Sequence, residues 1–137
     1  MSDVNAWIAV GAGGALGAVV RGGVYRFVGG RIQRDVSKHA GRLGLARATL
    51  LVNLAGSFLL GIGLALFAAL PADHATRIFW LTGFCGSLTT FSSFCADAVR
   101  LAGQGDRMAL VAYLLANGVL SLLAVSLGLV VVSKLAG

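Results

Sequence analysis

Four long apolar segments restrict the fold of this chain more than any other feature. They cover residues 6–28, 48–70, 78–99 and 108–133. At 1.5 Å per helical residue, each is long enough to cross the roughly 30 Å hydrocarbon core of a membrane. The chain is 58% hydrophobic and only 12% charged, about half the charged fraction of a soluble domain. We therefore predict an all-α membrane protein, a single domain over residues 1–137 with four transmembrane helices.

Basic residues are concentrated on one side of the predicted spans. Six of the eleven Lys and Arg lie within residues 26–47, mostly in the one long connection, 29–47. With four spans, both termini and the loop between spans two and three share a side that carries only Arg77 and Lys134. The other nine basic residues fall opposite if Arg21 is counted there. Because basic loops are retained in the cytoplasm, we predict a cell inner (plasma) membrane protein with termini outside, and no nucleic-acid partner.

The third segment contains an unusual polar stretch at its centre. Residues 83–94 read GFCGSLTTFSSF, with two glycines and five hydroxyl side chains at membrane depth. Irregular backbone at that depth is tolerated where it is buried in protein or lines a water-filled path. We predict that the third helix is broken at its centre and belongs to an ion or substrate pathway.

Neutral polar residues recur on the other spans at helical spacing. Tyr113, Asn117 and Ser121 stand at i, i+4 and i+8, and Asn53 and Ser57 at i and i+4, so each set shares one helix face. Hydroxyl and amide groups can donate hydrogen bonds to an anion without carrying charge. The alternative role is to join helices, as Ser, Thr and Asn often do in membranes. Two stripes together with the break favour a pathway.

Two phenylalanine rings and two charged side chains complete the candidate site of the predicted pathway. Phe91 and Phe94 are three residues apart, so they share a helix face, and their positive ring edges suit a dehydrated anion. Arg21 lies inside the first span, where it would draw anions to a pore mouth or extend to the interface. Asp97 lies one turn beyond Phe94. It is either an ion-pair partner of Arg21, an acid of the pore vestibule or a solvated residue at the helix end.

The absence of glutamate and the presence of paired glycines help to separate a channel from a transporter or a scaffold. The chain contains no glutamate, which argues against small four-span proton-coupled multidrug transporters, since such proteins need a carboxylate at depth. Gly13 and Gly17 form a GxxxG pair, which indicates tight helix packing or dimerisation. A non-conducting membrane scaffold would explain these glycines but not the TTFSSF break.

Three segments carry a family resemblance: GGALGAVVR at 13–21, TLLVNLAGSFLLG at 49–61 and GFCGSLTTFSSF at 83–94. In this order they make the chain resemble the CrcB/Fluc family of fluoride channels over nearly its whole length. The resemblance implies an antiparallel dimer that encloses two narrow fluoride pores. It also implies a structural sodium ion, held at the dimer centre by backbone carbonyls of Gly86 and Thr89 from both subunits.

The same resemblance assigns fluoride-binding roles to individual residues. Asn117 stands where a serine is more usual in the family, and Asp97 where a glutamate is frequent. The implied pore residues are Phe91 and Phe94 through their ring edges, Asn53 from span two, Thr90 and Ser92 near the break, and Tyr113, Asn117 and Ser121 along span four.

The implied mechanism is passive and non-enzymatic. Neutral donors would replace the water around fluoride, and cytoplasmic fluoride would leave down its gradient, which would confer fluoride resistance. A homodimer of dual topology should carry nearly balanced charge across the membrane, whereas this chain has nine basic residues against two. We therefore hypothesise a heterodimer with an oppositely oriented homologue, with the homodimer as the alternative.

Overall fold

The structure is a computed structural model that describes the backbone of residues 3–33 and 38–136. In the described part every regular element is helical, which confirms the predicted all-α architecture. The elements are α1 (Asp3–Gln33), α2 (Lys38–Ala69), α3 (His74–Arg77), η1 (Ile78–Cys85), α4 (Gly86–Leu88), α5 (Phe91–Gly103), α6 (Arg107–Leu115), η2 (Ala116–Leu120) and α7 (Ser121–Ala136).

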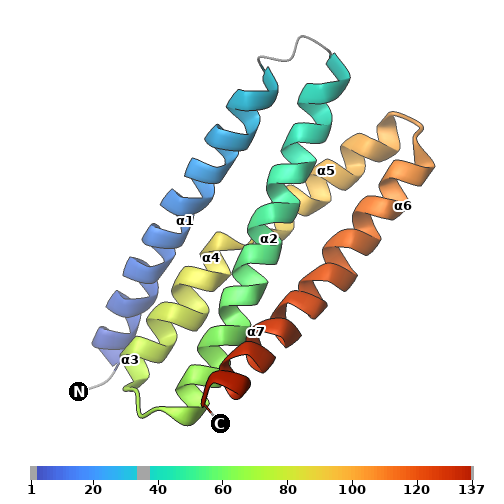
Figure 1. The fold of residues 1–137 in the computed structure, drawn as a ribbon. Coiled ribbons are helices and arrows are strands. Elements are labelled where there is room, and N and C mark those ends of the chain that lie inside the picture. The colour runs from blue at the N-terminus through green and yellow to red at the C-terminus, as the bar shows by residue number, and fades with distance from the viewer. Residues whose placement is uncertain (1–2, 34–37, 137) are drawn as a thin grey trace.

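Within residues 3–33 and 38–136, four helical segments are long and apolar enough to cross a membrane. They are Val4–Val28, Leu45–Ala69, His74–Gly103 and Arg107–Leu135, and each overlaps one of the four predicted spans. They run as a bundle of tilted rods, with both chain ends at the same end of the bundle (Figure 1). This arrangement agrees with the even number of spans expected from the sequence.

The basic connection at 29–47 is shorter than predicted. Helix α1 continues to Gln33 and α2 already begins at Lys38. Only residues 34–37 separate the two helices, and they lie outside the described residues. The basic segment therefore extends the helices at the end of the bundle opposite the termini (Figure 1).

The third span is interrupted, as predicted, but it also contains a feature that the sequence pattern does not reveal. It begins as α3, widens into the π-helix η1, returns to α-helix in α4 and breaks before α5. A second π-helical segment, η2, lies within the fourth span. Such wide turns are rare and are frequent at functional sites.

Glycines allow the spans to approach closely within one protomer. A Cβ atom on Gly13 or Gly17 would overlap the carbonyl oxygen of Phe79 or Phe84, where α1 packs on the third span. Gly61 and Gly128 serve the same purpose where α2 packs along α7. The Gly13–Gly17 pair thus serves packing inside this protomer.

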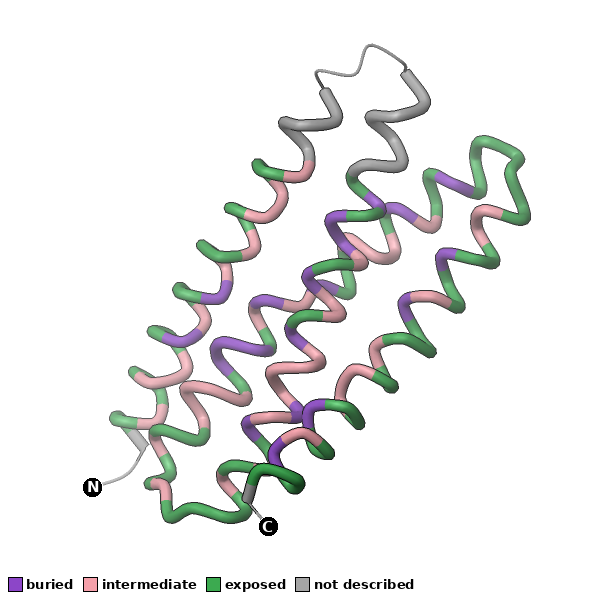
Figure 2. The backbone as a smooth tube through the Cα atoms, in the orientation of Figure 1, coloured by how far each residue is buried: buried purple, intermediate pink, exposed green. Residues whose placement is uncertain are grey.

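Buried residues are few and lie on the inner sides of the helices (Figure 2). One core cluster comprises Val52, Phe84, Cys85 and Leu88. The outer surface carries exposed apolar side chains on every span, including Trp7 and Leu122. An apolar exterior around a small interior is the pattern expected of helices that face lipid or another subunit.

A short turn joins the third and fourth spans. Gly105 has a φ of 75°, which glycine adopts without strain. The next residue, Asp106, accepts a hydrogen bond from the backbone N–H of Ala109 over 2.9 Å and so caps α6. The turn lets the fourth span return beside the third.

Candidate functional site

The break in the third span is built by two consecutive threonines. Thr89 and Thr90 both have extended backbone angles, φ −74°, ψ 158° and φ −148°, ψ 112°. The Thr90 hydroxyl caps α5 by accepting from the N–H of Ser93 over 3.2 Å, the usual role of threonine at a helix start. The Thr89 hydroxyl donates to the carbonyls of Cys85 and Gly86, at 3.1 and 3.3 Å.

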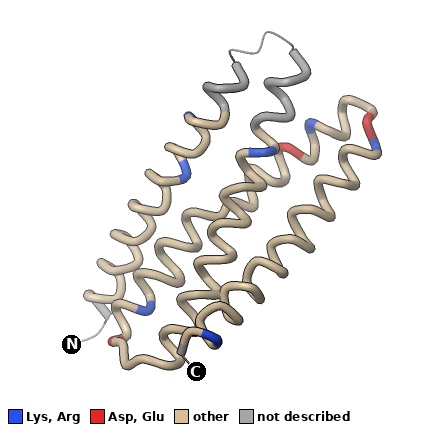
Figure 3. The backbone as a smooth tube through the Cα atoms, viewed as in Figure 1, with Lys and Arg blue, Asp and Glu red and all other residues tan. Residues whose placement is uncertain are grey.

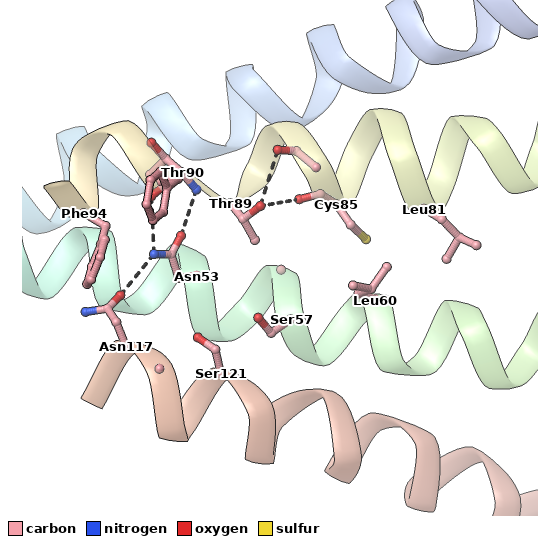
Figure 4. Close-up of a pocket in the computed structure, with 14 residues that line it drawn as sticks. Asn53, Ser57, Leu60, Leu81, Cys85, Thr89, Thr90, Phe94, Asn117 and Ser121 are labelled. Carbon is pink, nitrogen blue, oxygen red and sulfur yellow. Dashed lines mark hydrogen bonds between the residues drawn. The ribbon is translucent and has the colours of Figure 1, made fainter. Parts of the chain in front are cut away.

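Asn53 holds the break from the second span. Its Oδ1 accepts from the backbone N–H of Thr90 over 2.8 Å, and its Nδ2 lies 3.4 Å from the Thr90 carbonyl oxygen. Nδ2 also donates to Oδ1 of Asn117 over 3.0 Å. One amide therefore replaces the helical partners of Thr90 and links the second, third and fourth spans (Figure 4).

A cavity of about 420 Å³ opens beside the break. Neutral hydrogen-bonding side chains from three spans face it, among them Ser57 and Ser121 from opposite helices (Figure 4). Its lining is Asn53, Gly56, Ser57, Leu60, Leu81, Cys85, Gly86, Thr89, Thr90, Phe91, Phe94, Asn117, Gly118 and Ser121. No lysine, arginine, aspartate or glutamate is in this set, so an ion in the cavity would meet amides, hydroxyls and rings.

Three aromatic rings form a row at one end of the cavity. The rings of Phe91 and Phe94 are 5.7 Å apart between centroids, and those of Phe94 and Tyr113 are 5.6 Å apart. The Phe91 side chain is strongly exposed although it lies at mid-span, with 78% of its surface accessible. A large exposed apolar ring at a polar break is unusual, because such surfaces commonly mark interaction sites.

Asp97 is not solvated, which corrects one of the alternatives considered for it. The residue is 4% exposed, and its Oδ2 accepts from the hydroxyls of Thr49 and Tyr113 over 2.6 and 3.4 Å. Its Oδ1 lies 2.5 Å from Nη1 of Arg100. Its ion-pair partner is therefore Arg100 and not Arg21.

Arg21 lies against the break. Its Nη1 donates to the carbonyl oxygen of Thr89 over 3.4 Å, so the first span delivers a positive charge to the interrupted backbone. A broken helix leaves carbonyls without helical partners, and a guanidinium is well suited to satisfy one of them. This contact favours a place beside the break over extension to the interface, and both roles stay predictions.

Most of the predicted pore residues come together. Asn53, Thr90, Phe91, Phe94, Asn117 and Ser121 all line the cavity, and so do Gly86 and Thr89. Two others are not part of the lining but contact residues that are: the Ser92 hydroxyl is 3.3 Å from that of Thr90, and Tyr113 packs on Phe94.

Other lining residues were not predicted from the sequence. Gly118 and Cys85 lie within or beside the π-helical turns, which hydropathy and spacing do not indicate. Cys85 and Cys95 are both free thiols, in agreement with their separation along one span.

Most charged residues of the described chain lie toward the two ends of the bundle, and Arg21, which reaches the Thr89 carbonyl at the break, is an exception. Figure 3 shows most of them near its two ends, with basic positions more numerous toward the end away from the termini. Arg26, Arg47, Arg100 and Arg107 belong to segments at that end, whereas Arg77 and Lys134 lie at the other. This distribution is the one on which the predicted orientation depends.

Comparisons with known proteins agree with this geometry. A family profile described as "CrcB-like protein, Camphor Resistance (CrcB)" matches residues 8–129. A "Fluoride-specific ion channel FluC 2" of Natronomonas pharaonis is 42% identical, over 89% of this chain and 90% of its own length. A "Fluoride-specific ion channel FluC" of Rhizobium meliloti is 42% identical over 92% and 94%, and one of Aeromonas salmonicida is 35% identical over 96% and 98%. Since both the profile and these relatives span nearly the whole sequence, the chain belongs to the CrcB-like protein family, as a multi-pass membrane protein.

Proposed function

We propose that this chain forms a fluoride-selective channel that exports cytoplasmic fluoride passively and thereby confers fluoride resistance. One observation carries the proposal: the cavity at the broken third span is lined by neutral donors and aromatic rings and by no charged side chain. The names of its relatives support fluoride as the ion. The process is transport down a gradient and requires no catalysis.

The lining chemistry suits a small, strongly hydrated anion. Asn53 and Asn117 offer amide N–H groups, while Thr90 and Ser121 offer hydroxyls, and together these can replace water as fluoride enters. The ring edges of Phe91 and Phe94 carry partial positive charge and can contact an anion that has lost its water. Since none of these groups is charged, the ion is bound weakly enough to leave.

Two further residues contact lining residues without lining the cavity themselves. The Ser92 hydroxyl lies beside that of Thr90 and can orient it. Tyr113 packs on Phe94, and its hydroxyl donates to Asp97. We assign Ser92 and Tyr113 supporting roles in the pore, with Arg21 and Asp97 as the charges nearest to it.

We infer that the functional unit is an antiparallel dimer with two pores. The cavity lies beside Phe91, whose ring is largely exposed, and one four-span subunit offers only part of a wall around it. A second subunit in the opposite orientation would cover the rings and close the path. The chain itself forms one four-span domain.

The charge distribution favours a heterodimer over a homodimer. A chain with nine basic residues on one side against two on the other is expected to insert in one orientation, with termini outside and the basic segment in the cytoplasm. An oppositely oriented homologue would then supply the other half. A dual-topology homodimer is the alternative, and it requires equal insertion both ways.

The break also suits a structural sodium ion at the dimer centre. The N–H of Thr90 turns to Asn53, so the Gly86 carbonyl loses its helical donor and keeps only the 3.3 Å contact from the Thr89 hydroxyl. Oxygen ligands of this kind suit hard cations. Carbonyl oxygens of Gly86 and Thr89 from both subunits would hold the ion. The Thr89 carbonyl oxygen accepts from Arg21 with one lone pair, so its second lone pair would face the ion.

Fluoride release from liposomes tests the proposal. Vesicles loaded with fluoride and chloride would contain the purified chain alone or with an oppositely biased homologue, and an ion electrode would record each anion. Fast fluoride release with chloride retained is expected, and release by the chain alone would favour the homodimer. Absence of release in both preparations, or release driven only by a pH gradient, would reject the channel in favour of a scaffold or a proton-coupled transporter.

A further inference from the structure

Arg100 and Asp97 form an ion pair beside the aromatic end of the cavity. Nη1 of Arg100 lies 2.5 Å from Oδ1 of Asp97. The Asp97 side chain is 5% exposed, whereas that of Arg100 is 42% exposed. The carboxylate is therefore fixed inside the bundle while its counter-charge lies at the surface, one helical turn further along α5.

The carboxylate joins all four spans. Its Oδ2 accepts from Thr49 of α2 and from Tyr113 of α6, and the Thr49 hydroxyl lies 2.7 Å from that of Tyr25 in α1. Because the Thr49 proton goes to the carboxylate, Tyr25 must donate to Thr49. Two hydroxyls and one guanidinium thus reach the carboxylate directly, and a third hydroxyl reaches it through Thr49, so the site suits an ionised carboxylate as acceptor.

This position brings a negative charge close to an anion path. The Tyr113 hydroxyl that donates to Asp97 belongs to the ring that packs on Phe94 at 5.6 Å, and Phe94 lines the cavity. An unpaired carboxylate there would repel an arriving anion through protein of low dielectric constant. The ion pair with Arg100 cancels that charge at its source.

We propose that Arg100 is a positioning residue of the anion path, which holds and neutralises Asp97 so that the carboxylate can join the four spans without repelling fluoride. The inference rests on the proposed function. Removal of the Arg100 charge should weaken fluoride access to the path and leave the path itself intact. It should therefore raise the fluoride concentration that half-saturates transport, with little change in the maximal rate.

The test compares Arg100→Gln, Arg100→Lys and the double variant Asp97→Asn with Arg100→Gln, and uses Arg107→Gln as the matched control. Arg107 carries the same charge just beyond the turn that follows α5. Initial fluoride release would be measured in the dimeric preparation that conducts, over a series of fluoride concentrations, at low ionic strength and with added impermeant sodium gluconate. Size-exclusion chromatography would establish that each variant is folded.

The expected result for Arg100→Gln is a roughly threefold or larger rise in half-saturating fluoride at low ionic strength. The rise should shrink with added salt, and the maximal rate should stay within about twofold of the unmodified protein. Arg100→Lys and Arg107→Gln should resemble the unmodified protein. In the double variant, which also lacks the Asp97 charge, half-saturating fluoride should return toward the unmodified value, although the loss of the carboxylate acceptor can lower stability.

Three results would overturn the inference: half-saturation unchanged in Arg100→Gln, a lower maximal rate that added salt does not alter, or a double variant that keeps the defect. If Arg100→Gln does not fold, the folded double variant decides, since normal half-saturation supports the inference and raised half-saturation opposes it. Failure of the unmodified dimer to release fluoride would instead reject the proposed function.

Discussion

The side-chain amides of Asn53 and Asn117 meet directly across the cavity, with Nδ2 of Asn53 donating to Oδ1 of Asn117 over 3.0 Å. Asn117 itself is held by its own Nδ2, which donates to the Tyr113 carbonyl one turn earlier over 3.1 Å. The pore amide of the second span is therefore already engaged by a side chain of the fourth. Fluoride must compete with that acceptor for the Asn53 donor.

We predict that Asn117→Ser increases fluoride flux. The shorter serine side chain cannot reach Asn53 as Asn117 does, so Nδ2 of Asn53 becomes available to the ion. The new hydroxyl keeps a hydrogen-bond donor among the polar residues of the fourth span. One neutral hydrogen bond is worth about 1 kcal/mol net, or about fivefold in rate. Initial release from fluoride-loaded liposomes measures the change, and Val119→Ser on the exposed side of the same turn is the control. An unchanged or lower flux would mean that the Asn53–Asn117 pair does not compete with fluoride.

The glycines of α1 lead to a prediction about stability. Gly17→Ala places a Cβ against the backbone of Phe84 and Leu88, whereas Gly14→Ala in the same helix meets no atom within 4 Å. Backbone atoms cannot swing aside, so Gly17→Ala should cost about 1–3 kcal/mol. Thermal loss of the monodisperse peak in detergent would record it. Equal melting of the two alanine variants would contradict the close approach of α1 to the third span.

Local sequence was enough for parts of the fold and insufficient for others, for physical reasons. Four spans follow from hydropathy alone, and the break follows from Thr89 and Thr90 because a hydroxyl cap needs only its own neighbourhood. The π-helical turns and the Asn53–Asn117 contact depend on how close neighbouring helices come. The role of Asp97 could not be predicted from the sequence for the same reason. Its partners Thr49 and Tyr113 lie on other spans, and nothing in the sequence marks Arg100 as its ion-pair partner.

Thr90 is predicted to be sensitive to the loss of its hydroxyl. Thr90→Val keeps the shape but removes the cap of α5 and the 3.0 Å hydrogen bond to the Ser93 hydroxyl. Loss of a threonine cap costs about 1 kcal/mol, and the break should become less ordered, with lower fluoride flux. Thr90→Ser, which retains the hydroxyl, is the control. Liposome flux and melting temperature would be measured together, and a fully active valine variant would refute the role of the cap.

Asp73 supplies a pH prediction outside the spans. The backbone N–H of Thr76 donates to its Oδ1 over 2.6 Å, which lowers the pKa of Asp73 from its ordinary 3.8. A depressed pKa means that the capped α3 turn gains stability above the ordinary pKa and loses it as pH falls through the lowered value. The carboxyl carbon shift of Asp73, followed by NMR during acid titration, should have its midpoint below 3.8. A midpoint at or above that value would contradict the cap.

Thr49 offers the sharpest test of how the four spans are joined. Thr49→Val is nearly isosteric, yet it removes a 2.6 Å donor from Asp97 and the partner of the Tyr25 hydroxyl. Thr49 is fully buried, so water cannot replace the lost hydroxyl and the cost should be about 1–3 kcal/mol. Thr49→Ser should recover most of it, because the serine hydroxyl can reach the same two partners. Melting temperatures of the purified proteins provide the measurement. If the valine and serine variants both have melting temperatures close to that of the unmodified protein, the hydrogen-bond network through Asp97 contributes little to stability. The helices are then held together by their glycine contacts and apolar packing.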